Sequence, residues 1–262
     1  MSGHSYTFTH ALCRKPSHSI VDGLRAADVG DPSYMAFDKE HSAYVAALQA
    51  TGASVHVLEP LEAFPDSVFI EDAALCLKGV AICLRQGADT RRAETAVLKP
   101  TLETLMNDVV DLKTSGFVDG GDIMCSDDTV MVGLSARTTQ LGAKDLQPIV
   151  ADLGYGMNVF ETPTGVLHFK TDSSLLDAET IFSTKRLSKS GCFDKFRVID
   201  VPEDELAAAN AIRFNDTVFL SAGHTKSAEL LDQHGYKVVV LPMYEAAKVD
   251  GGLSCLSLRY SV

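Results

Sequence analysis

The chain has 262 residues, of which 46% are hydrophobic and 22% charged, and it contains no tryptophan. Its 23 basic and 35 acidic side chains give a formal net charge of −12, which opposes binding to nucleic acids and favours small cationic ligands. No apolar stretch approaches the ~20 residues that a membrane-spanning helix needs, and the first residues lack the basic-then-apolar pattern of a signal peptide. We therefore expect one domain over residues 1–262, a cytoplasmic location, and neither nucleic acid nor membrane as a partner.

Three segments along the chain share the order helix end, glycine, apolar strand. The glycines are Gly52, Gly154 and Gly235, and a glycine just past a helix end is the usual left-handed cap. The strands predicted after them cover residues 53–58, 155–160 and 236–241. Alternation of helices and strands with such caps predicts an α/β protein.

A second series of polar residues interleaves with the first, each member standing before an apolar segment. Its members are Asp72, Asp119, His168, Asn210 and Cys255, which follow one another at intervals of 42 to 49 residues. A period of about 40–50 residues is typical of architectures in which each repeat is one supersecondary unit. Five units of strands plus one helix around an axis would bring these five strand ends to one central site.

Each of these features also has an ordinary structural explanation. A lone cysteine such as Cys255 usually packs as a small hydrophobic residue, His168 in a strand-like segment fits a buried histidine, and Gly120–Gly121 indicates a turn. The pair Glu71 and Asp72 is harder to explain in this way, because two acids within an apolar run are costly to bury without a cation.

The six cysteines are scattered along the chain without a CxxC pair. This spacing argues against a zinc site or a disulfide framework and suits a reducing compartment. We expect no metal and no cofactor.

Five motifs, in this order, resemble the dimethylarginine dimethylaminohydrolases, which are guanidine-modifying enzymes of the pentein superfamily. The motifs are residues 64–72 (FPDSVFIED), 118–124 (VDGGDIM), 133–138 (GLSART), 167–171 (LHFKT) and 251–255 (GGLSC), and the likeness runs essentially from Ala11 to the C-terminus. The resemblance implies a five-bladed α/β propeller of pseudo-symmetric ββαβ repeats, the pentein fold.

The resemblance also implies a role for particular residues. Cys255 would be the nucleophile, His168 the general acid and base, and Asp119 the acid that orients the histidine and faces the guanidinium. Some bacterial relatives have a glutamate at the position of Asp119, so this chain departs from them by a shorter side chain. The implied substrate contacts are Asp72 with Glu71 at the guanidinium end, Asp66 at the α-amino group, Arg91 and Arg137 at the α-carboxylate, and Leu24 and Val249 in the lining.

The chemistry of guanidine hydrolysis agrees with these residue types. A guanidinium carbon is a poor electrophile, so attack needs a thiolate, the strongest nucleophile that a protein offers near pH 7. Carboxylates hold the planar guanidinium by charge-assisted hydrogen bonds, and a histidine can donate and then accept a proton near neutrality. We therefore predict hydrolysis of asymmetric dimethylarginine and monomethylarginine to citrulline and dimethylamine or methylamine through a covalent thiouronium intermediate.

Two other functions stay open. An arginine deiminase of the same superfamily would use the same chemistry, although those enzymes usually carry a helical insertion for which the motif spacing leaves no room. A catalytically silent pentein that binds a macromolecule would have no reason to retain Asp119, His168 and Cys255 together. The preference between the two methylated substrates and the choice between monomer and homodimer are also open. Whether the polar, glycine-containing loop of residues 21–30 forms a mobile lid over the site is open as well.

Overall fold

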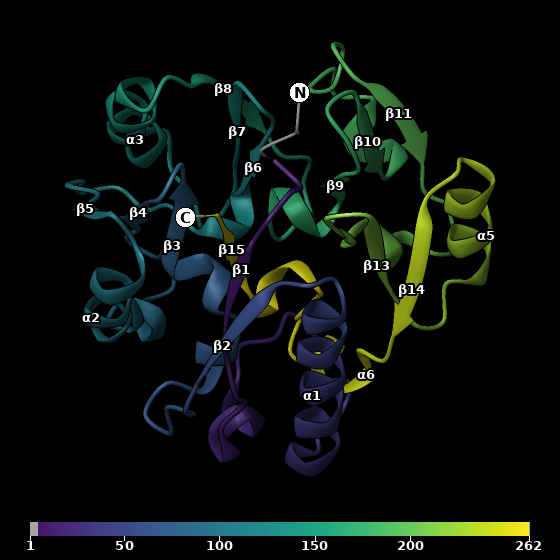
Figure 1. Ribbon diagram of the computed structural model, residues 1–262, viewed down its shortest axis with the longest axis horizontal. Coiled ribbons are helices and arrows are strands. Elements are labelled where there is room, and N and C mark those ends of the chain that lie inside the picture. The colour runs from purple at the N-terminus through teal and green to yellow at the C-terminus, as the bar shows by residue number, and fades with distance from the viewer. Residues whose placement is uncertain (1–4, 262) are drawn as a thin grey trace.

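The computed structural model describes residues 5–261. Within that range the strands form five three-stranded sheets, which are arranged as blades around a common centre (Figure 1). In each blade the first two strands are antiparallel, and the third strand is parallel to the second. The predicted five-bladed α/β propeller of ββαβ repeats is confirmed.

Four blades are continuous segments of the chain, each with its helix before the last strand. The first contains β3 (Ala74–Leu77), β4 (Val80–Cys83), α2 (Glu94–Leu105) and β5 (Asp108–Asp111). The second contains β6 (Ile123–Cys125), β7 (Thr129–Leu134), α3 (Gln140–Asp152) and β8 (Gly156–Glu161). The third contains β9 (Ser173–Leu175), β10 (Thr180–Ser183), α4 (Lys185–Ser188) and β11 (Arg197–Asp200). The fourth contains β12 (Ile212–Phe214), β13 (Thr217–Ser221), α5 (Thr225–Gln233) and β14 (Lys237–Leu241).

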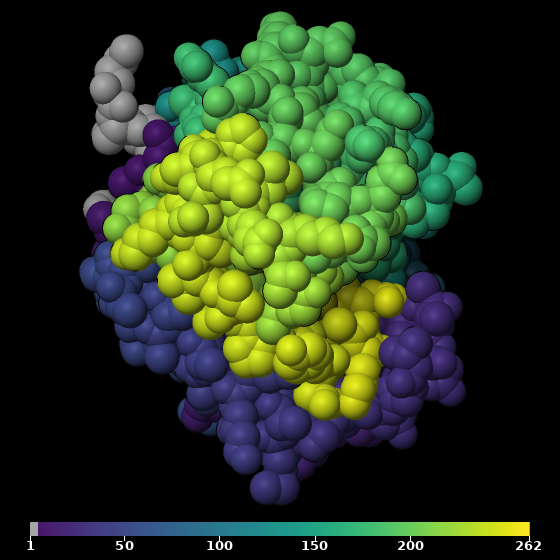
Figure 2. All heavy atoms as spheres, turned by 90° about the vertical axis from the view of Figure 1, so that its right-hand side faces the viewer, coloured from purple at the N-terminus to yellow at the C-terminus, as the bar shows by residue number. Residues whose placement is uncertain are grey.

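The fifth blade combines the two ends of the chain. It contains β15 (Leu258–Tyr260), β1 (His10–Arg14), α1 (Tyr34–Ala50) and β2 (Ser54–Leu58). The antiparallel pairing of β15 with β1 closes the ring. A short helix, α6 (Tyr244–Ala247), precedes this blade and packs against α1, and Figure 2 shows the yellow C-terminal segments against the purple and blue N-terminal ones. Closure therefore brings residues near position 255 beside residues from the first third of the chain.

The glycine caps lie where the sequence predicts them. α1, α3 and α5 end at residues 50, 152 and 233, and the glycines that follow have φ angles of +90° at Gly52, +83° at Gly154 and +84° at Gly235. A residue with a Cβ atom is strained in this left-handed region, whereas glycine adopts it freely. Each cap turns the chain into the parallel third strand of its blade.

A short 3-10 helix stands directly before the first strand of each blade. These are η3 (Ile70–Ala73), η5 (Gly120–Asp122), η6 (Phe169–Thr171), η7 (Leu206–Ala209) and η8 (Ser254–Leu256). η3 contacts η8 and η5, η5 contacts η6, and η6 contacts η7, so the turns follow one another around the ring. The expected strand after Cys255 accordingly starts at Leu258, after the turn, rather than at once.

The hydrophobic core is divided among clusters between neighbouring blades. The largest joins Phe37, Tyr44 and Leu48 of α1 to Phe214 and Phe219 of the fourth blade. Because each cluster lies between blades, packing holds the blades in position around the centre. Among the helices of residues 5–261, none is both long enough and apolar enough to cross a membrane.

Candidate active site

The polar residues of the repeating series meet at the 3-10 helices. Asp72 lies in η3 and Cys255 in η8, whereas Asp119 and His168 directly precede η5 and η6, and Asn210 directly follows η7. A pocket beside these turns is lined by eight of the predicted site residues: Leu24, Asp66, Asp72, Arg91, Arg137, His168, Val249 and Cys255. The tertiary structure thus brings together side chains that lie up to 231 residues apart in sequence.

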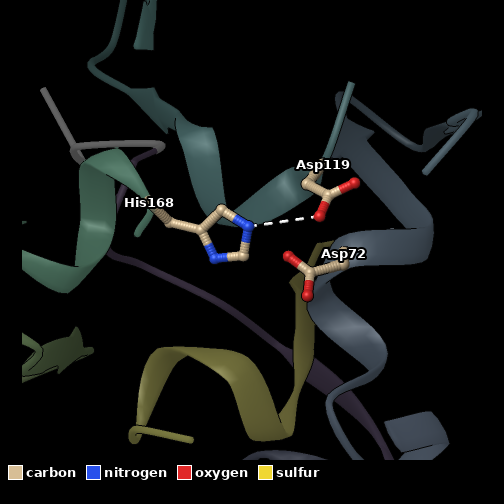
Figure 3. A group of neighbouring side chains, drawn as sticks. All are labelled: Asp72, Asp119 and His168. Atoms are coloured by element: carbon tan, nitrogen blue, oxygen red, sulfur yellow. Dashed lines mark hydrogen bonds and ion pairs between the residues drawn. The ribbon is translucent and has the colours of Figure 1, made fainter. Parts of the chain in front are cut away.

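The imidazole of His168 is oriented by Asp119. Its Nε2 atom lies 3.1 Å from Oδ2 of Asp119 (Figure 3), and both side chains are buried. The other oxygen of Asp119 accepts a hydrogen bond of 2.7 Å from the backbone N–H of Gly87. Thr138 Oγ1 accepts from the backbone N–H of Asp119 at 3.0 Å. The shorter acid at this position therefore still reaches the histidine and is itself held in place.

Asp72 presents a buried carboxylate beside this pair. Its Oδ1 accepts a hydrogen bond of 2.8 Å from the backbone N–H of Gly121, and its Oδ2 accepts one of 2.6 Å from Nη1 of Arg91. Burial by itself raises the pKa of Asp72, but the positive charges of His168 and Arg91 outweigh burial and lower that pKa. Asp72 is thus ionised at neutral pH and can attract a cation.

Arg91 lies behind Asp72 and was predicted from the family pattern to grip a carboxylate of the substrate. Its guanidinium donates to both oxygens of Glu94 at 3.0 and 2.9 Å and to the carbonyl oxygen of Phe69 at 2.8 Å. Burial disfavours its charge, but Glu94 and Asp72 overcome this and hold the pKa of Arg91 well above its usual value. Arg91 therefore anchors Asp72 from behind the pocket.

Glu94 is a supporting residue that the sequence reasoning missed. It stands three positions after Arg91 in the first turn of α2 and forms a buried ion pair with it. An acid at this spacing from an arginine is the local signal that could have identified it.

The pair Gly120–Gly121 does more than form a turn. A Cβ atom on Gly121 would lie 2.7 Å from Nδ1 of His168 and 2.9 Å from Oδ1 of Asp72, and one on Gly120 would lie 2.0 Å from the carbonyl oxygen of Glu71. Glycine is required here because η3, η5 and η6 approach one another too closely for a side chain. The same holds at Gly251, where a Cβ atom would meet the ring of Phe69 at 2.3 Å.

Cys255 is held in η8 by backbone hydrogen bonds. Its own N–H donates to the carbonyl oxygen of Gly252 at 3.2 Å, and the N–H of Ser254 donates to Oδ1 of Asn210 at 2.9 Å. Burial raises the pKa of the thiol to about 11, and the negative charges of Glu71 and Asp72 act in the same direction. Without a bound cation the thiol is therefore protonated at neutral pH.

His168 is also protonated in the free protein. Burial lowers its pKa, but the carboxylates of Asp72, Asp122 and Asp119 outweigh burial and raise the pKa to about 9. Asp122 in turn accepts hydrogen bonds from Ser135 Oγ at 2.6 Å and from the backbone N–H of Phe169 at 2.9 Å. The imidazolium is thus ready to donate a proton.

The structure places Glu71 elsewhere than the family pattern implied. Its carboxylate is not part of the lining of this pocket; Oε1 instead accepts hydrogen bonds of 2.5 Å from Nζ of Lys170 and 2.5 Å from Nη2 of Arg259. Successive side chains of a 3-10 helix point about 120° apart, so Glu71 and Asp72 in η3 face different sides. Glu71 therefore belongs to the wall behind the pocket.

Asp66, Leu24 and Arg137 lie in the same lining. Oδ1 of Asp66 accepts a hydrogen bond of 2.9 Å from the backbone N–H of Leu24, which ties the loop of residues 21–30 to η2 (Pro65–Val68). The Arg137 side chain is 21% exposed, and its Nη1 lies 3.8 Å from Oδ2 of Asp119. The pocket thus offers both a carboxylate and an accessible guanidinium to a ligand.

Asp72, Asp119 and His168 also have the spacing of potential metal ligands, with one ligand atom from each within 4.8 Å of the others. All four carboxylate oxygens, however, already have hydrogen-bond partners: Gly121 and Arg91 for Asp72, and Gly87 and His168 for Asp119. These contacts fit an orienting network around the imidazole better than a metal coordination shell.

Comparisons with known sequences identify close relatives. A family model described as N,N dimethylarginine dimethylhydrolase, eukaryotic, matches residues 35–171. The N(G),N(G)-dimethylarginine dimethylaminohydrolase of Pseudomonas aeruginosa is 37% identical over 254 residues, which cover 97% of this chain and 100% of the relative. The protein of the same name from Streptomyces coelicolor is 33% identical and covers 95% of this chain and 96% of its own length.

Solved structures agree with the sequence comparisons. A cysteine-to-serine mutant of the Pseudomonas aeruginosa enzyme, complexed with citrulline, superposes with a TM-score of 0.94 at 36% identity and covers 97% of this chain and 100% of its own. A dimethylarginine dimethylaminohydrolase adduct with S-methyl-L-thiocitrulline has a TM-score of 0.93 at 36% identity, with the same coverage. The N-terminal domain of ArgZ, a cyanobacterial arginine dihydrolase, has a TM-score of 0.86 at 21% identity and covers 96% of this chain and 98% of its own. That level of identity shows a shared fold alone.

Proposed function

The chain belongs to the dimethylarginine dimethylaminohydrolase family, and we propose that it acts through the pocket that contains Cys255, His168 and Asp72. The reaction is the hydrolysis of Nω-methylated arginines to citrulline and dimethylamine or methylamine. The observation that carries the residue assignment is the convergence, in one lining, of a thiol, an imidazolium and an ionised carboxylate from three different blades.

The charges of the lining match the two ends of a methylated arginine. Asp72 is an ionised, buried carboxylate that would pair with the guanidinium. Asp66 would accept hydrogen bonds from the α-amino group, and the guanidinium of Arg137 would bind the α-carboxylate. Leu24 and Val249 would contact the aliphatic part of the substrate from the loop and from the segment after α6.

The first chemical step depends on the charge of the substrate. A guanidinium beside Cys255 offsets the negative charges that raise the pKa of the thiol, so binding favours loss of the thiol proton to solvent. The thiolate then forms a bond to the guanidinium carbon. As the C–N bond to the methylated nitrogen breaks, His168 donates its proton to the departing amine, and the substrate stays bound as an S-linked thiouronium.

The second step regenerates the enzyme. His168, now neutral, accepts a proton from a water molecule, and the oxygen of that water forms a bond to the thiouronium carbon. The C–S bond then breaks, which releases citrulline and restores the thiol of Cys255. Asp119 contributes by holding Nε2 of the imidazole in one orientation through both proton transfers.

The decisive experiment compares citrulline release from asymmetric dimethylarginine and from arginine, with Cys255→Ser as the control. We expect turnover of the methylated substrate and loss of turnover in the variant. Turnover of arginine alone would make the enzyme a deiminase with the same mechanism, and turnover of neither would favour a binding protein. In a parallel assay His168→Ala should accumulate a covalent adduct, seen as a mass increase on the protein; rapid multiple turnover would contradict its role.

A further inference from the structure

A second pocket lies on the other side of the 3-10 helices from the candidate active site. Residues from β3, β6, β9, β12 and β15, the first strand of every blade, line a cavity of about 130 Å³ that is partly open to solvent. No lining residue is shared between the two pockets in the described part of the chain. Glu71 and Asp72, which are adjacent in sequence, lie between the two pockets. Glu71 lines the second pocket and Asp72 lines the candidate active site.

The wall of this second pocket carries excess positive charge. Nζ of Lys170 and Nη2 of Arg259 both contact the same oxygen of Glu71, and the three side chains are 14%, 14% and 4% exposed. Two cations therefore share one carboxylate in a largely desolvated place. Arg213, a third lining cation, is separately stabilised between the rings of Tyr6 and Tyr236. Because unpaired buried charge is costly, the Lys170–Arg259 pair favours one further negative charge.

Hydrogen-bonding capacity also remains at this wall. Lys170 has three N–H donors and contacts one acceptor, Glu71, within residues 5–261. Oε2 of Glu71 and Oγ of Ser174 are both buried and have no partner in the same range. The wall thus offers donors to an anion and, at Oε2 of Glu71, an acceptor for an O–H group. Leu75, Leu175 and Leu258 supply an apolar surface next to it.

We propose that this second pocket binds a small organic monocarboxylate that also carries a hydroxyl group. The carboxylate pairs with Lys170 and Arg259, the hydroxyl donates to Oε2 of Glu71, and the hydrocarbon part contacts the leucines. The single negative charge matches the excess of one positive charge among Lys170, Arg259 and Glu71.

Occupancy of the second pocket acts on the catalytic thiol. Arg259 links the two sites, because its guanidinium contacts Glu71 and its Nη1 also donates to the carbonyl oxygens of Ser254 and Ser257, on either side of Cys255, at 2.9 and 3.0 Å. The charge of Glu71 already raises the pKa of Cys255. A second anion bound to Lys170 and Arg259, the cations that screen Glu71, raises the pKa of Cys255 further. The ligand therefore opposes formation of the thiolate.

Binding is tested by isothermal titration calorimetry of the full chain with lactate, propionate and lactamide. Lactate should saturate one site; propionate, which lacks the hydroxyl, should bind about tenfold more weakly, in line with the loss of one hydrogen bond to a charged group, and the uncharged lactamide should not bind. Equal binding of lactate and propionate would overturn the hydroxyl contact. Equal binding of lactamide or of inorganic phosphate would overturn the monocarboxylate class, and saturation by none of the probes would overturn the site.

Paired variants separate this site from the carboxylate clamp expected at Arg137. Lys170→Gln should weaken lactate binding at least tenfold, whereas Arg137→Met should leave it unchanged; the opposite pattern would place lactate in the active site. Lys170→Gln also removes one of the two cations that pair with Glu71, which can disturb the fold, so a second variant is needed. Ser174→Val places methyl groups in the pocket and should also weaken lactate binding. Unchanged binding in a folded Ser174→Val protein would contradict the location.

The effect of the second pocket on Cys255 is tested by the reactivity of the thiol, without an assay of turnover. Iodoacetamide alkylation of Cys255, followed by mass spectrometry of its peptide at pH 9, should slow at least twofold in saturating lactate, because less thiolate is present. Lys170→Gln should abolish the slowing. An alkylation rate that lactate leaves unchanged in the wild-type protein would disprove the coupling.

Discussion

Asp119 and His168 stand 49 residues apart in sequence, at the starts of two neighbouring 3-10 helices, and their side chains meet at 3.1 Å between Oδ2 and Nε2. The contact lies in the buried centre of the ring, where Asp72 and Asp122 add negative charge around the imidazole. A protonated His168 is therefore part of the stable folded state as well as of the proposed reaction. This link between charge and fold leads to a test that needs no substrate.

The stability of the protein should fall as pH rises through the titration of His168. The pKa of His168 is raised to about 9 in the folded protein, against about 6.5 in an unfolded chain. The charged form thus stabilises the fold fully below about pH 6.5, and this contribution is lost as pH rises towards 9. The free energy of unfolding, measured by chemical denaturation, should decrease between pH 6 and pH 9.5 in both proteins. The decrease should be about 1–3 kcal/mol larger in wild type than in His168→Gln. The exposed His234→Gln variant is the control and should behave as wild type; equal losses in wild type and His168→Gln would disprove the assignment.

Gly121→Ala should damage catalysis by displacing His168 and Asp72. The added Cβ would lie within 2.9 Å of both side chains, and a shift of about 1 Å in a catalytic group can cost about 100-fold in rate. We expect kcat/KM to fall by about that factor. Gly156→Ala is the matched control, because its Cβ would meet its nearest neighbour at 3.7 Å, an ordinary contact. Similar activity in the two variants would mean that the close approach at Gly121 is unimportant.

Arg137→Ala should raise KM for methylated arginine by about 10- to 100-fold, the range expected for a lost charge-assisted hydrogen bond. A carboxylate-free alkylguanidine should be affected much less, since it has no group for Arg137 to bind. Arg92→Ala is the control: this arginine pairs with Asp89 and packs over the ring of Phe117, outside the pocket lining. If both substrates respond equally to Arg137→Ala, the residue does not bind the carboxylate.

The thiol of Cys255 should ionise more readily when a guanidinium ligand is bound. Its pKa is about 11 in the free protein, owing to burial and to the charges of Glu71 and Asp72, and a cation in the pocket should lower it. Titration by thiolate absorbance, with the spectrum of Cys255→Ser subtracted, should show a lower pKa in the presence of a non-reactive guanidinium amino acid. An unchanged pKa would contradict activation of the thiol by the substrate.

The roles of the candidate site residues were predicted from a family resemblance carried by short motifs, whereas the local pattern by itself indicates fewer features of the site. Gly-Gly-Leu-Ser-Cys identifies the turn of Cys255, and Glu71–Asp72 signals a buried charge that needs a cation. The local pattern does not show where that cation comes from. Asp72 is neutralised by Arg91, 19 residues away, and Glu71 by Lys170 and Arg259, 99 and 188 residues away. Such partners are selected by folding through space, and no sequence spacing encodes them.

The fold could be predicted from the sequence, because the patterns that indicate it are local and repeated. Glycine caps follow α1, α3 and α5, in three of the five blades, and a polar residue stands before the first strand of every blade, so their spacing predicts blades around a centre. Only the tertiary structure decided the direction in which each polar side chain points. In η3 the 3-10 geometry sends Asp72 into one pocket and Glu71 into the other, and the pairing of β15 with β1 sets Cys255 beside them. A side chain's direction depends on backbone angles and on neighbours from other blades, and these exist only once the ring has closed.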